Sequence, residues 1–567
     1  MYHSVRRFTL SAFLTSFGWH AQGGEPRFDV WTVDSLVKVF QDDLPTAFGD
    51  TCIDVARGEH ASVQVVVRSD SVLKNLKARV GELRNVDMQT ANLVARPPRF
   101  IGYVPVSLPI QDAPKDVVRK TPANFPDPLL EEVPDQIPPD QSQPIWITVP
   151  IPDDAFPGEY QGVLSITARV GEQDIAASFP IHIYVHHARV GKARLWVTNW
   201  FTMDSHYSQM RRKRDSHAYW SLLRKYARNM ADHRQNVILI SPLDLAEFKI
   251  GEQGTLDIDF SRFDRWVSIF EEEGVIGRIE GGHLGDRLAD FRSPFFLRTF
   301  QIANGAVISA NADPLSVEAD EFYGQFFPAL VRHLKEKGWL DRYMQHLVDE
   351  PVPKNANGYR AIAALARKYG PELRIIEACH TRDLIGSIDN WVPMFNFYHI
   401  DFKFYKERQR AGEEVWFYTC WKPQKEYANR FVEQPLLKTR LLHWINFRYG
   451  ATGYLHWGYN QWTSDDPFLK TTVNRNPARP EQYLPAGDCW IVYPGKDGPI
   501  DSIRHEAMRD GTADYELFKM IEDLNPEVAM NLVQKHVLVF DRYECDVAKF
   551  RETRRELLEA LSGKVEQ

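Results

Sequence analysis

The chain has 567 residues, of which 44% are hydrophobic and 12% aromatic, and a formal net charge of −8. This length exceeds what one hydrophobic core usually serves, so at least two domains are expected. Acidic and basic residues are mixed along the whole chain, and the lack of a basic stripe argues against nucleic acid as a partner.

The first residues resemble an export signal. Residues 1–22 contain two arginines, then an apolar stretch from Phe8 to Phe17, then small or polar residues, which is typical of a secretory signal peptide. We therefore expect a secreted or periplasmic bacterial protein. No other segment approaches the roughly 18 apolar residues that a membrane span requires, so no integral membrane segment is expected.

Residues 25–190 read as a β-rich domain. Short runs such as "ASVQVVVRS" and "GEYQGVLSITARV" alternate apolar and polar residues and are separated by Pro, Gly and Asp turns, which is a strand pattern. Several such strands without an amphipathic helix between them predict an antiparallel β-sandwich. Such a domain either packs against its neighbour or binds carbohydrate, and the packing role is favoured because sandwich architecture alone implies no function.

Residues 191–567 alternate strand-like runs with amphipathic helical patterns, the signature of βαβ units. Helical spacing is clear at 217–233, 321–338, 357–370 and 435–450. The strand-like runs are 194–201, 236–240, 276–285, 343–351, 373–381, 391–400, 414–421 and 453–462. This count predicts a (β/α)8 TIM-type barrel that includes the C-terminal helices. We also expect a hairpin near 245–265 and a lengthened loop between the third and fourth strands.

In such barrels the active site lies at the carboxyl ends of the strands. The candidates there are carboxylates, amides, histidines and aromatic residues: Asp349, Glu350, His283, His380, Asn396, Asn460, Trp421, Trp457 and Tyr459. This mixture suits a neutral polyhydroxylated ligand such as a sugar. The five cysteines lack metal-ligand spacing, and no glycine-rich phosphate loop is present, so we expect neither a metal nor an organic cofactor.

Asp349 and Glu350 close the fourth strand, in "LVDEP". Adjacent carboxylates suit substrate-assisted glycoside hydrolysis, in which a 2-acetamido group of the sugar is the nucleophile and the two carboxylates orient it and protonate the leaving oxygen. A neighbouring carboxylate and a partly apolar pocket would raise the pKa of the acid. The alternative is a solvated pair, since the same dipeptide at Asp320 and Glu321 begins an ordinary helix.

The other candidates have two interpretations each. Tyr459, Trp457 and Trp421 could hydrogen-bond and enclose an acetamido group, or they could belong to the core. His283 and His380 could bind sugar hydroxyls or hold a loop through hydrogen bonds.

Two segments resemble a known family. These are "LVDEP" and residues 487–518, "GDCWIVYPGKDGPIDSIRHEAMRDGTADYELF", and they are similar to glycoside hydrolase family 123, the β-N-acetylgalactosaminidases. The resemblance implies a β-sandwich followed by a barrel, with Asp349 orienting the acetamido group and Glu350 as general acid/base. It also implies that the partner is an oligosaccharide or glycoconjugate with terminal β-linked N-acetylgalactosamine.

Two other functions stay open: a glycosidase with another sugar specificity, and a non-catalytic glycan-binding protein. The sequence leaves galacto or gluco preference, the aglycone and the oligomeric state undecided. The helix expected within 502–521 carries Arg504, Glu506, Arg509, Asp510 and Asp514, which we interpret as a structural network of charges because they lie along a helix and not at a strand end.

Overall fold

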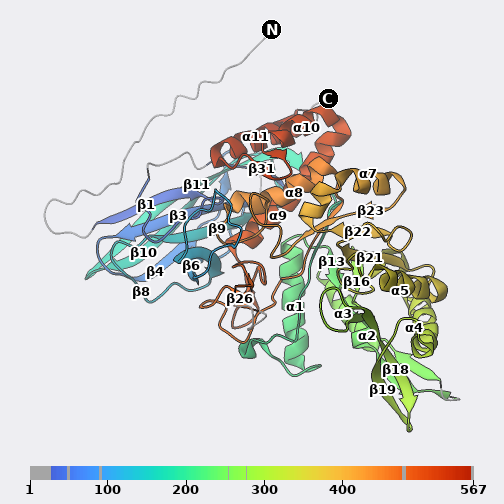
Figure 1. Ribbon diagram of the computed structural model, residues 1–567. Helices are drawn as coiled ribbons and strands as arrows, with labels where there is room; N and C mark the ends of the chain where they lie inside the picture. The colour runs from blue at the N-terminus through green and yellow to red at the C-terminus, as the bar shows by residue number, and fades with distance from the viewer. Residues whose placement is uncertain are drawn as a thin grey trace.

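The computed structural model describes residues 27–46, 52–87, 92–252, 255–275, 277–474 and 481–563. The predicted signal peptide at 1–22 lies outside these residues. A β-rich N-terminal region lies beside a second region of parallel strands and helices (Figure 1). Within the described part of the chain, no helix is both long and apolar enough to cross a membrane.

The N-terminal region consists of two sheets. The first has the order β1 (Phe28–Asp34), β3 (His60–Ser69), β9 (Gln143–Pro150), β6 (Arg99–Val106) and β7 (Ala123–Leu130). The second has the order β2 (Cys52–Arg57), β11 (Gln173–Arg189), β10 (Gly158–Val170), β4 (Leu73–Val80) and β8 (Gln136–Ile137), and β5 (Arg84–Asn85) also pairs with β10. The pairs are antiparallel except that β2 runs parallel to β11, which corrects the prediction of a purely antiparallel domain.

The two sheets share a hydrophobic core because their strands alternate inward and outward residues. Along β10 every second residue from Tyr160 to Val170 is buried, as the pleat of a strand with one solvated face requires. Val65, Ile147, Leu164 and Ile183 belong to one buried cluster drawn from both sheets. The N-terminal region is therefore a two-layer β structure.

The second region is built on parallel strands. One sheet has the order β13 (Val237–Leu239), β16 (Arg278–Gly281), β20 (Tyr343–Gln345), β21 (Arg374–Cys379), β22 (Asn390–Pro393) and β23 (Glu414–Val415). The other has the order β12 (Trp196–Asn199), β25 (Gly453–His456) and β24 (Phe417–Thr419). At one junction Met394 bridges to Tyr418 in parallel. At the other, Asn236 N donates to Val197 O at 3.3 Å.

Helices pack around these strands. They are α1 (His217–Asp232), α2 (Pro242–Leu245), α3 (Ser261–Glu272), α4 (Val317–Glu336), α5 (Ala356–Tyr369), α6 (Phe395–Ile400), α7 (Phe402–Arg410) and α8 (Leu436–Tyr449), with 3-10 turns at Ser208–Met210 and Leu340–Arg342. Helix α1 begins where the Ser216 hydroxyl accepts a hydrogen bond from Tyr219 N, an N-cap that satisfies one free backbone donor. It buries Leu223, Ala227 and Met230, spaced three or four residues apart.

Two insertions interrupt the alternation. β14 (Glu247–Ile250) and β15 (Leu256–Asp259) form the hairpin expected near 245–265. Between the third and fourth parallel strands, β17 (Gly285–Arg287), β18 (Phe295–Ala303) and β19 (Ala306–Ala312) form an antiparallel sheet where only a longer loop was expected. The β18–β19 hairpin projects from the molecule (Figure 1).

The prediction of a strand over 391–400 is correct for its first residues and wrong for the rest. The strand β22 ends at Pro393, and residues 395–400 form helix α6. Phe395 and Tyr398 are both buried, three residues apart, which places them on one face of a helix. The aromatic run hid this boundary because apolar residues occupy nearly every position.

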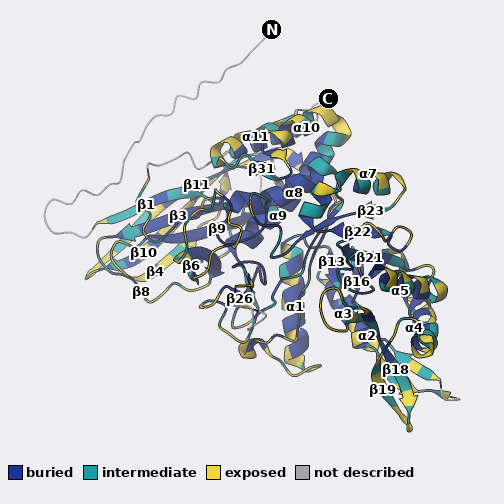
Figure 2. Ribbon diagram, viewed as in Figure 1, coloured by how far each residue is buried: buried dark blue, intermediate teal, exposed yellow. Residues whose placement is uncertain are grey.

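The C-terminal part consists of α9 (Ile503–Leu524), α10 (Pro526–Gln534) and α11 (Val547–Ser562), with the short strands β26 (Val473–Asn474), β27 (Tyr483–Leu484), β28 (Tyr493–Pro494), β29 (Pro499–Ile500), β30 (Val537–Val539) and β31 (Arg542–Tyr543). Helices α8 and α9 pack against each other and are buried on nearly all sides (Figure 2). Helix α11 packs on β11 and β2 of the N-terminal region.

The charges along α9 take most of their partners from other elements. Arg504 pairs with Asp127 of β7 at 2.7 Å, and both side chains are inaccessible to solvent. Asp514 accepts hydrogen bonds from Arg440 of α8 and Arg554 of α11. The expected network of charges is therefore present, and it connects the helices to the N-terminal sheets.

Candidate active site

A cavity of about 500 Å³ lies among the ends of the parallel strands and contains both adjacent carboxylates. Its lining residues are Trp200, Asp349, Glu350, Ala378, Tyr418, Cys420, Trp421, Leu455, Trp457, Gln461, Gln482, Tyr483 and Leu484. They come from segments far apart in the sequence, so only the fold brings them together. Carboxylates next to indole and phenol rings are the composition expected of a sugar pocket.

The backbone of the carboxylate pair is held in an unusual conformation. Strand β20 ends at Gln345, and Glu350 has a φ of +45°, in the left-handed region that non-glycine residues rarely adopt. The Arg287 guanidinium donates to the carbonyls of Asp349 and Glu350 at 2.5 and 2.8 Å, and Pro351 follows directly. Strain of this kind persists where surrounding contacts determine the conformation, as at active sites.

Glu350 is the better hydrogen-bonded of the two carboxylates. Its Oε1 accepts from His380 Nε2 at 3.1 Å and from the Tyr418 hydroxyl, and His380 Nε2 also lies 2.5 Å from that hydroxyl. Burial by itself would raise the pKa of Glu350, but the hydrogen bonds from His380 and Tyr418 and the nearby positive charge outweigh it and hold the pKa below its usual range.

Asp349 lies in a different environment from Glu350. Its side chain is 41% exposed, and among the described residues none donates a hydrogen bond to its carboxylate. Burial of the site and the negative charge of Glu350 raise the pKa of Asp349 to about 6. We had expected the neighbouring charge to raise the pKa of Glu350. In the structure the rise falls on Asp349, because His380 and Tyr418 both donate to Glu350.

A buried charged network lies beneath Asp349. His346, directly after β20, has its Nδ1 3.0 Å from Glu377 Oε1 and its Nε2 3.4 Å from Glu280 Oε1, and all three side chains are inaccessible to solvent. Burial would lower the pKa of His346, but the two carboxylates raise it to about 10. Burial would raise the pKa of Glu377, but proximity to His283 and His346 lowers it to about 2. His346 and Glu377 are therefore both charged at neutral pH.

His283 lies between this network and the pocket. Its Nε2 is 3.9 Å from Asp349 Oδ1 and 3.6 Å from Glu377 Oε1. Its ring meets those of Trp200 and His346 at centroid distances of 5.5 and 5.0 Å. His283 is thus near Asp349 without being part of the cavity lining, and His380 contacts Glu350 instead of facing the cavity.

Two of the predicted aromatic residues line the cavity. Trp457 follows β25 and donates from Nε1 to Asp488 at 3.1 Å, which fixes its indole. Trp421 follows β24 and is partly exposed. Trp200 joins them after β12, with its Nε1 donating to Glu280 at 3.1 Å. Three indoles therefore surround the space in front of the carboxylates.

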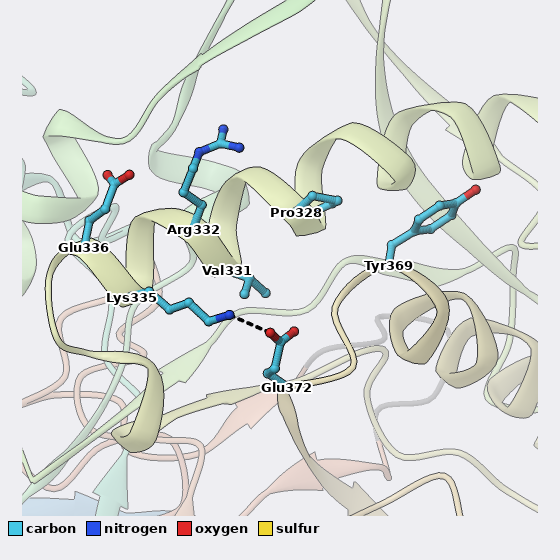
Figure 3. A pocket seen from close by; sticks show the side chains of 7 residues that line it. All are labelled: Pro328, Val331, Arg332, Lys335, Glu336, Tyr369 and Glu372. Carbon is cyan, nitrogen blue, oxygen red and sulfur yellow. Dashed lines mark hydrogen bonds and ion pairs between the residues drawn. The ribbon is translucent and has the colours of Figure 1, made fainter.

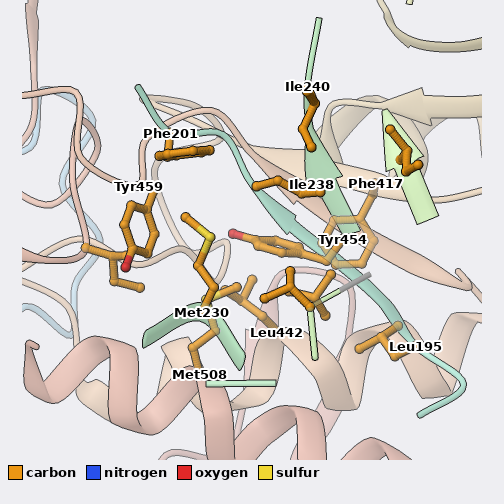
Figure 4. Packing of buried hydrophobic residues seen from close by; sticks show 14 of the residues in the cluster. Leu195, Phe201, Met230, Ile238, Ile240, Phe417, Leu442, Tyr454, Tyr459 and Met508 are labelled. Atoms are coloured by element: carbon orange, nitrogen blue, oxygen red, sulfur yellow. The ribbon is translucent and has the colours of Figure 1, made fainter. Parts of the chain in front are cut away.

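Three predicted residues lie elsewhere. Tyr459 is completely buried, with its hydroxyl donating to Asn229 of α1 at 2.6 Å, and it packs among Phe201 and Met230 in the core (Figure 4). The side-chain amide of Asn460 accepts a hydrogen bond from Thr202 N and donates one to Thr202 O. These two positions were misplaced because β25 ends at His456 and the chain then turns toward α1.

Asn396 lies in the first turn of α6 and not in a strand. It is not among the residues that line the cavity. The same boundary error, a strand extended through the aromatic run, accounts for its assignment to the site.

Sequence reasoning missed Tyr418 and Glu377. Tyr418 lies inside β24, where it looked like an ordinary strand residue. Glu377 lies inside strand β21, where the residues around it from 375 to 379 are apolar, and a charge in that position was a usable signal, since buried carboxylates need partners. Glu377 accepts hydrogen bonds from the backbone of Leu347 and Val348, and so it holds the segment that leads to Asp349.

Two groups of side chains in the described residues bring possible metal ligands together. They are His283, His346 and Glu377, and His233, Asp501 and His505. In the first group the two nitrogens of His346 already face carboxylates. In the second, His505 Nδ1 is 3.2 Å from Asp501 and the two imidazoles stack at 3.5 Å. The contacts of His346 and His505 account for these two side chains without a metal, and the expectation of a metal-free site stays a prediction.

A second hollow, of about 430 Å³, lies on the outer surface between α4 and the loop before β21 (Figure 3). Lys335 and Glu372 form an ion pair across it at 2.6 Å. Its residues are Pro328, Val331, Arg332, Lys335, Glu336, Tyr369 and Glu372. It has no carboxylate pair and no indole, so the cavity around Asp349 is the better candidate for the active site.

Comparison with known proteins gives matches to two family models. Residues 200–521 match the model of the glycoside hydrolase 123 catalytic domain, and residues 51–168 match that of the glycoside hydrolase 123 N-terminal domain. No curated protein sequence matches the chain. The catalytic-domain match spans more than half of the chain and contains both carboxylates.

Solved structures give the fold. A family 123 glycoside hydrolase from Clostridium perfringens, described for glycolipid glycan hydrolysis, matches with a TM-score of 0.69 at 16% identity, covering 95% of this chain and 97% of that one. A β-glucuronidase from Parabacteroides merdae (TM-score 0.29, 10% identity, 78% and 49% covered) and an endo-β-1,4-mannanase from Thermotoga petrophila (0.34, 12%, 57% and 77%) share too little to inform the site.

Proposed function

Because this chain belongs to glycoside hydrolase family 123 and is thus a glycosidase, we propose that it releases terminal β-linked N-acetylgalactosamine by retaining, substrate-assisted catalysis. The observation that carries the proposal is the carboxylate pair. Asp349 and Glu350 are adjacent and line one cavity, yet only Glu350 receives side-chain hydrogen bonds from the described residues. Such a difference separates the roles of two like groups.

In the first step, the acetamido carbonyl oxygen of the sugar attacks C1 while Glu350 protonates the glycosidic oxygen, so that the aglycone leaves as an alcohol. Asp349 accepts a hydrogen bond from the acetamido N–H and stabilises the positive charge of the resulting oxazoline-type ring. In the second step, Glu350 removes a proton from water, which attacks C1 and opens the ring. Two inversions at C1 give net retention.

The pair must hold one proton for this chemistry. In the free protein Asp349 has the higher pKa and Glu350 the lower. A bound acetamido N–H stabilises ionised Asp349, and a glycosidic oxygen favours protonated Glu350 as its donor. We therefore expect substrate binding to transfer the proton of the pair to Glu350, where the first step needs it.

The cavity walls suit a sugar with an acetamido group. Trp200, Trp421 and Trp457 offer flat apolar faces for the C–H side of a ring and for a methyl group. The Tyr418 hydroxyl lines the same cavity, and once Glu350 is protonated it can donate its hydrogen bond to an acetamido carbonyl instead of to Glu350. Tyr418 thus takes the role predicted for Tyr459, whose side chain is buried in the core.

Two further parts of the proposal concern the scaffold and its location. The parallel bridge between Met394 and Tyr418 and the bond from Asn236 to Val197 join the two parallel sheets at both edges, which supports a single closed (β/α)8 barrel. The N-terminal signal pattern supports export of the enzyme. A glycan of a glycolipid, as hydrolysed by the Clostridium perfringens relative, would be accessible to an exported enzyme.

The test is release of nitrophenol from its β-N-acetylgalactosaminide, β-N-acetylglucosaminide and β-galactoside by the wild type, Asp349→Asn and Glu350→Gln. We expect turnover of an acetamido sugar only, with losses of about a hundredfold or more in both variants. Cleavage of the plain galactoside would contradict the substrate-assisted mechanism and favour another sugar specificity. Binding of sugars in a thermal-shift assay without turnover would favour a non-catalytic glycan-binding protein.

A further inference from the structure

The N-terminal region reaches the rim of the active-site cavity through one loop between β6 and β7. We call residues 109–112 of this loop the brace loop. The cavity is lined on one side by residues 482–484 and on another by Trp421. Both of these walls hydrogen-bond to the brace loop, although they are separated by about sixty residues in the sequence.

The first wall is held by two bonds. Gln111 Nε2 donates to Glu481 O at 2.5 Å, and the Tyr483 hydroxyl donates to Pro109 O at 2.5 Å. Tyr483 and its two neighbours line the cavity, so these bonds hold the lining segment at its middle residue and at the residue just before it. Residues 483–484 form the two-residue strand β27, which within the described ranges pairs with the equally short β26 alone.

The second wall is held through Gln424. Its Oε1 accepts from Asp112 N at 2.7 Å, and its Nε2 donates to Trp421 O at 2.9 Å. Lys425 N donates to Asp112 O at 2.7 Å. A continuous path of hydrogen bonds therefore runs from the brace loop to the backbone of a residue in the cavity wall.

The base of the loop is anchored by buried charged residues. Ile110 N donates to both carboxylate oxygens of Glu433, at 3.0 and 3.2 Å. Lys38, which belongs to the N-terminal region, donates to the carbonyls on either side of Glu433, Val432 O and Gln434 O, at 2.5 and 2.8 Å. Glu433 and Lys38 are 2% and 6% exposed. Anchoring of this kind leaves the loop little freedom to move relative to the cavity.

We infer that the N-terminal region acts as a positioning element of the active site: the brace loop fixes two walls of the cavity that also holds the Asp349–Glu350 pair, and these walls contact bound sugar. This inference rests on the proposed glycosidase function. In this role the N-terminal region supports substrate binding by holding cavity walls that belong to the catalytic region, and it does not bind carbohydrate at a separate site of its own. Among the described residues the brace loop makes no hydrogen bond or ion pair with the side chains of Asp349 or Glu350, so it affects binding more than chemistry.

The experiment compares Gln111→Ala, Gln424→Ala and the double variant with wild type. Gln173→Ala, an exposed position at the start of β11, is the matched control. On the best nitrophenyl glycoside we expect KM to rise about fivefold per lost bond and kcat to stay within about twofold. Gln111 is exposed, so its variant should fold. An unchanged KM in a folded double variant would overturn the inference. So would a fall in kcat as large as the rise in KM together with a lower thermal midpoint, because that would indicate general damage to the fold.

Amide hydrogen exchange gives a readout independent of activity. We expect the double variant to exchange faster in peptides covering 420–426 and 481–485, with the N-terminal strands and the control variant unchanged. If the wild type cleaves none of the glycosides, the proposed function fails, and the exchange result still decides whether the loop braces the walls. Unchanged exchange in both peptides would show that it does not.

Discussion

At the scale of single residues, the chemistry depends on two donors that distinguish two adjacent carboxylates. Tyr418 and His380 both donate to the same oxygen of Glu350, while Asp349 faces the charge of Glu350 and of the buried Glu377. Hydrogen bonds to a charged carboxylate lower its pKa, and a neighbouring like charge raises it. The pair therefore keeps its last proton until about pH 6, and that proton starts on Asp349.

Removing one donor should move the pH profile in a known direction. In Tyr418→Phe the ionised form of Glu350 loses a hydrogen bond, so its pKa rises and the pair keeps its last proton to higher pH. We expect kcat/KM to fall above about pH 6 in the wild type, and this descending limb to shift to higher pH in the variant. Tyr184→Phe, on the exposed face of the N-terminal region, is the control. A descending limb at the same pH in both proteins would show that Tyr418 does not influence the pKa values of the Asp349–Glu350 pair.

Arg287 should matter for rate more than for stability. In Arg287→Met the carbonyls of Asp349 and Glu350 lose their shared donor, and Glu350 can leave its positive-φ conformation. We expect kcat to fall roughly tenfold to a hundredfold, because small displacements of catalytic groups have large effects. Steady-state kinetics together with a thermal melt measure both quantities. A variant with wild-type kcat would show that the strained conformation does not need this guanidinium.

At the scale of secondary-structure elements, three neighbouring strands each supply one member of the buried network. Glu280 comes from β16, His346 follows β20 and Glu377 belongs to β21. The imidazolium between two carboxylates joins the strands side by side and positions the segment that leads to Asp349. Breaking such a network leaves an unpaired charge in the interior, which is strongly destabilising.

This network predicts how stability depends on pH. His346 has its pKa raised from 6.5 to about 10, so its contribution is complete below pH 6.5 and is lost as the pH rises toward 10. Glu377 has its pKa lowered from 4.5 to about 2, so its contribution is complete above pH 4.5 and is lost as the pH falls toward 2. Between pH 4.5 and 6.5 both contributions are present.

Urea unfolding of the wild type and His346→Gln at pH 6 and pH 9.5 tests the first half of this dependence. We expect the free energy of unfolding of the wild type to decrease more between the two pH values than that of the variant. The difference of the two changes isolates His346 from all other titrating groups. Equal decreases in both proteins would mean that folding does not raise the pKa of His346.

At the scale of the whole molecule, the N-terminal region and the catalytic region share one interior. Leu36, Ile101 and Leu129 belong to the same buried hydrophobic cluster as the core of the catalytic region. Buried ion pairs cross the same boundary, between Arg504 and Asp127 and between Arg554 and Glu59. An interface of this kind resembles a domain core more than a flexible junction, and it keeps the brace loop in place.

Removing one crossing charge should destabilise the entire chain. Asp127→Ala leaves the Arg504 guanidinium buried without its carboxylate partner, and we expect the free energy of unfolding to fall by about 3–5 kcal/mol. Asp153→Ala, in an exposed pair with Arg189, should change it by less than about 1 kcal/mol. Urea unfolding followed by tryptophan fluorescence measures both. A second, separate transition in the wild type would contradict the shared interior.

The sequence by itself determined those features that depend on local pattern. Apolar periodicity placed most strands and helices, because side chains recur every two residues on a strand face and every three or four on a helix face. The strand-like run before Pro351 indicated where Asp349 and Glu350 would lie, but the predicted strand was too long, since β20 ends at Gln345 and the two carboxylates follow it in a loop. The strand at 391–400 was extended too far because an aromatic run satisfies both periods.

The tertiary structure decided which residues meet. Tyr459 lies in the core because packing sets the direction of the chain beyond the end of β25, whereas Tyr418 lines the cavity from within β24. The higher pKa fell on Asp349 because the donors to Glu350 come from other strands. Gln111 reached the cavity wall only because two regions dock. Electrostatic environment and cavity shape arise from groups far apart along the chain, so no local pattern of residues contains them.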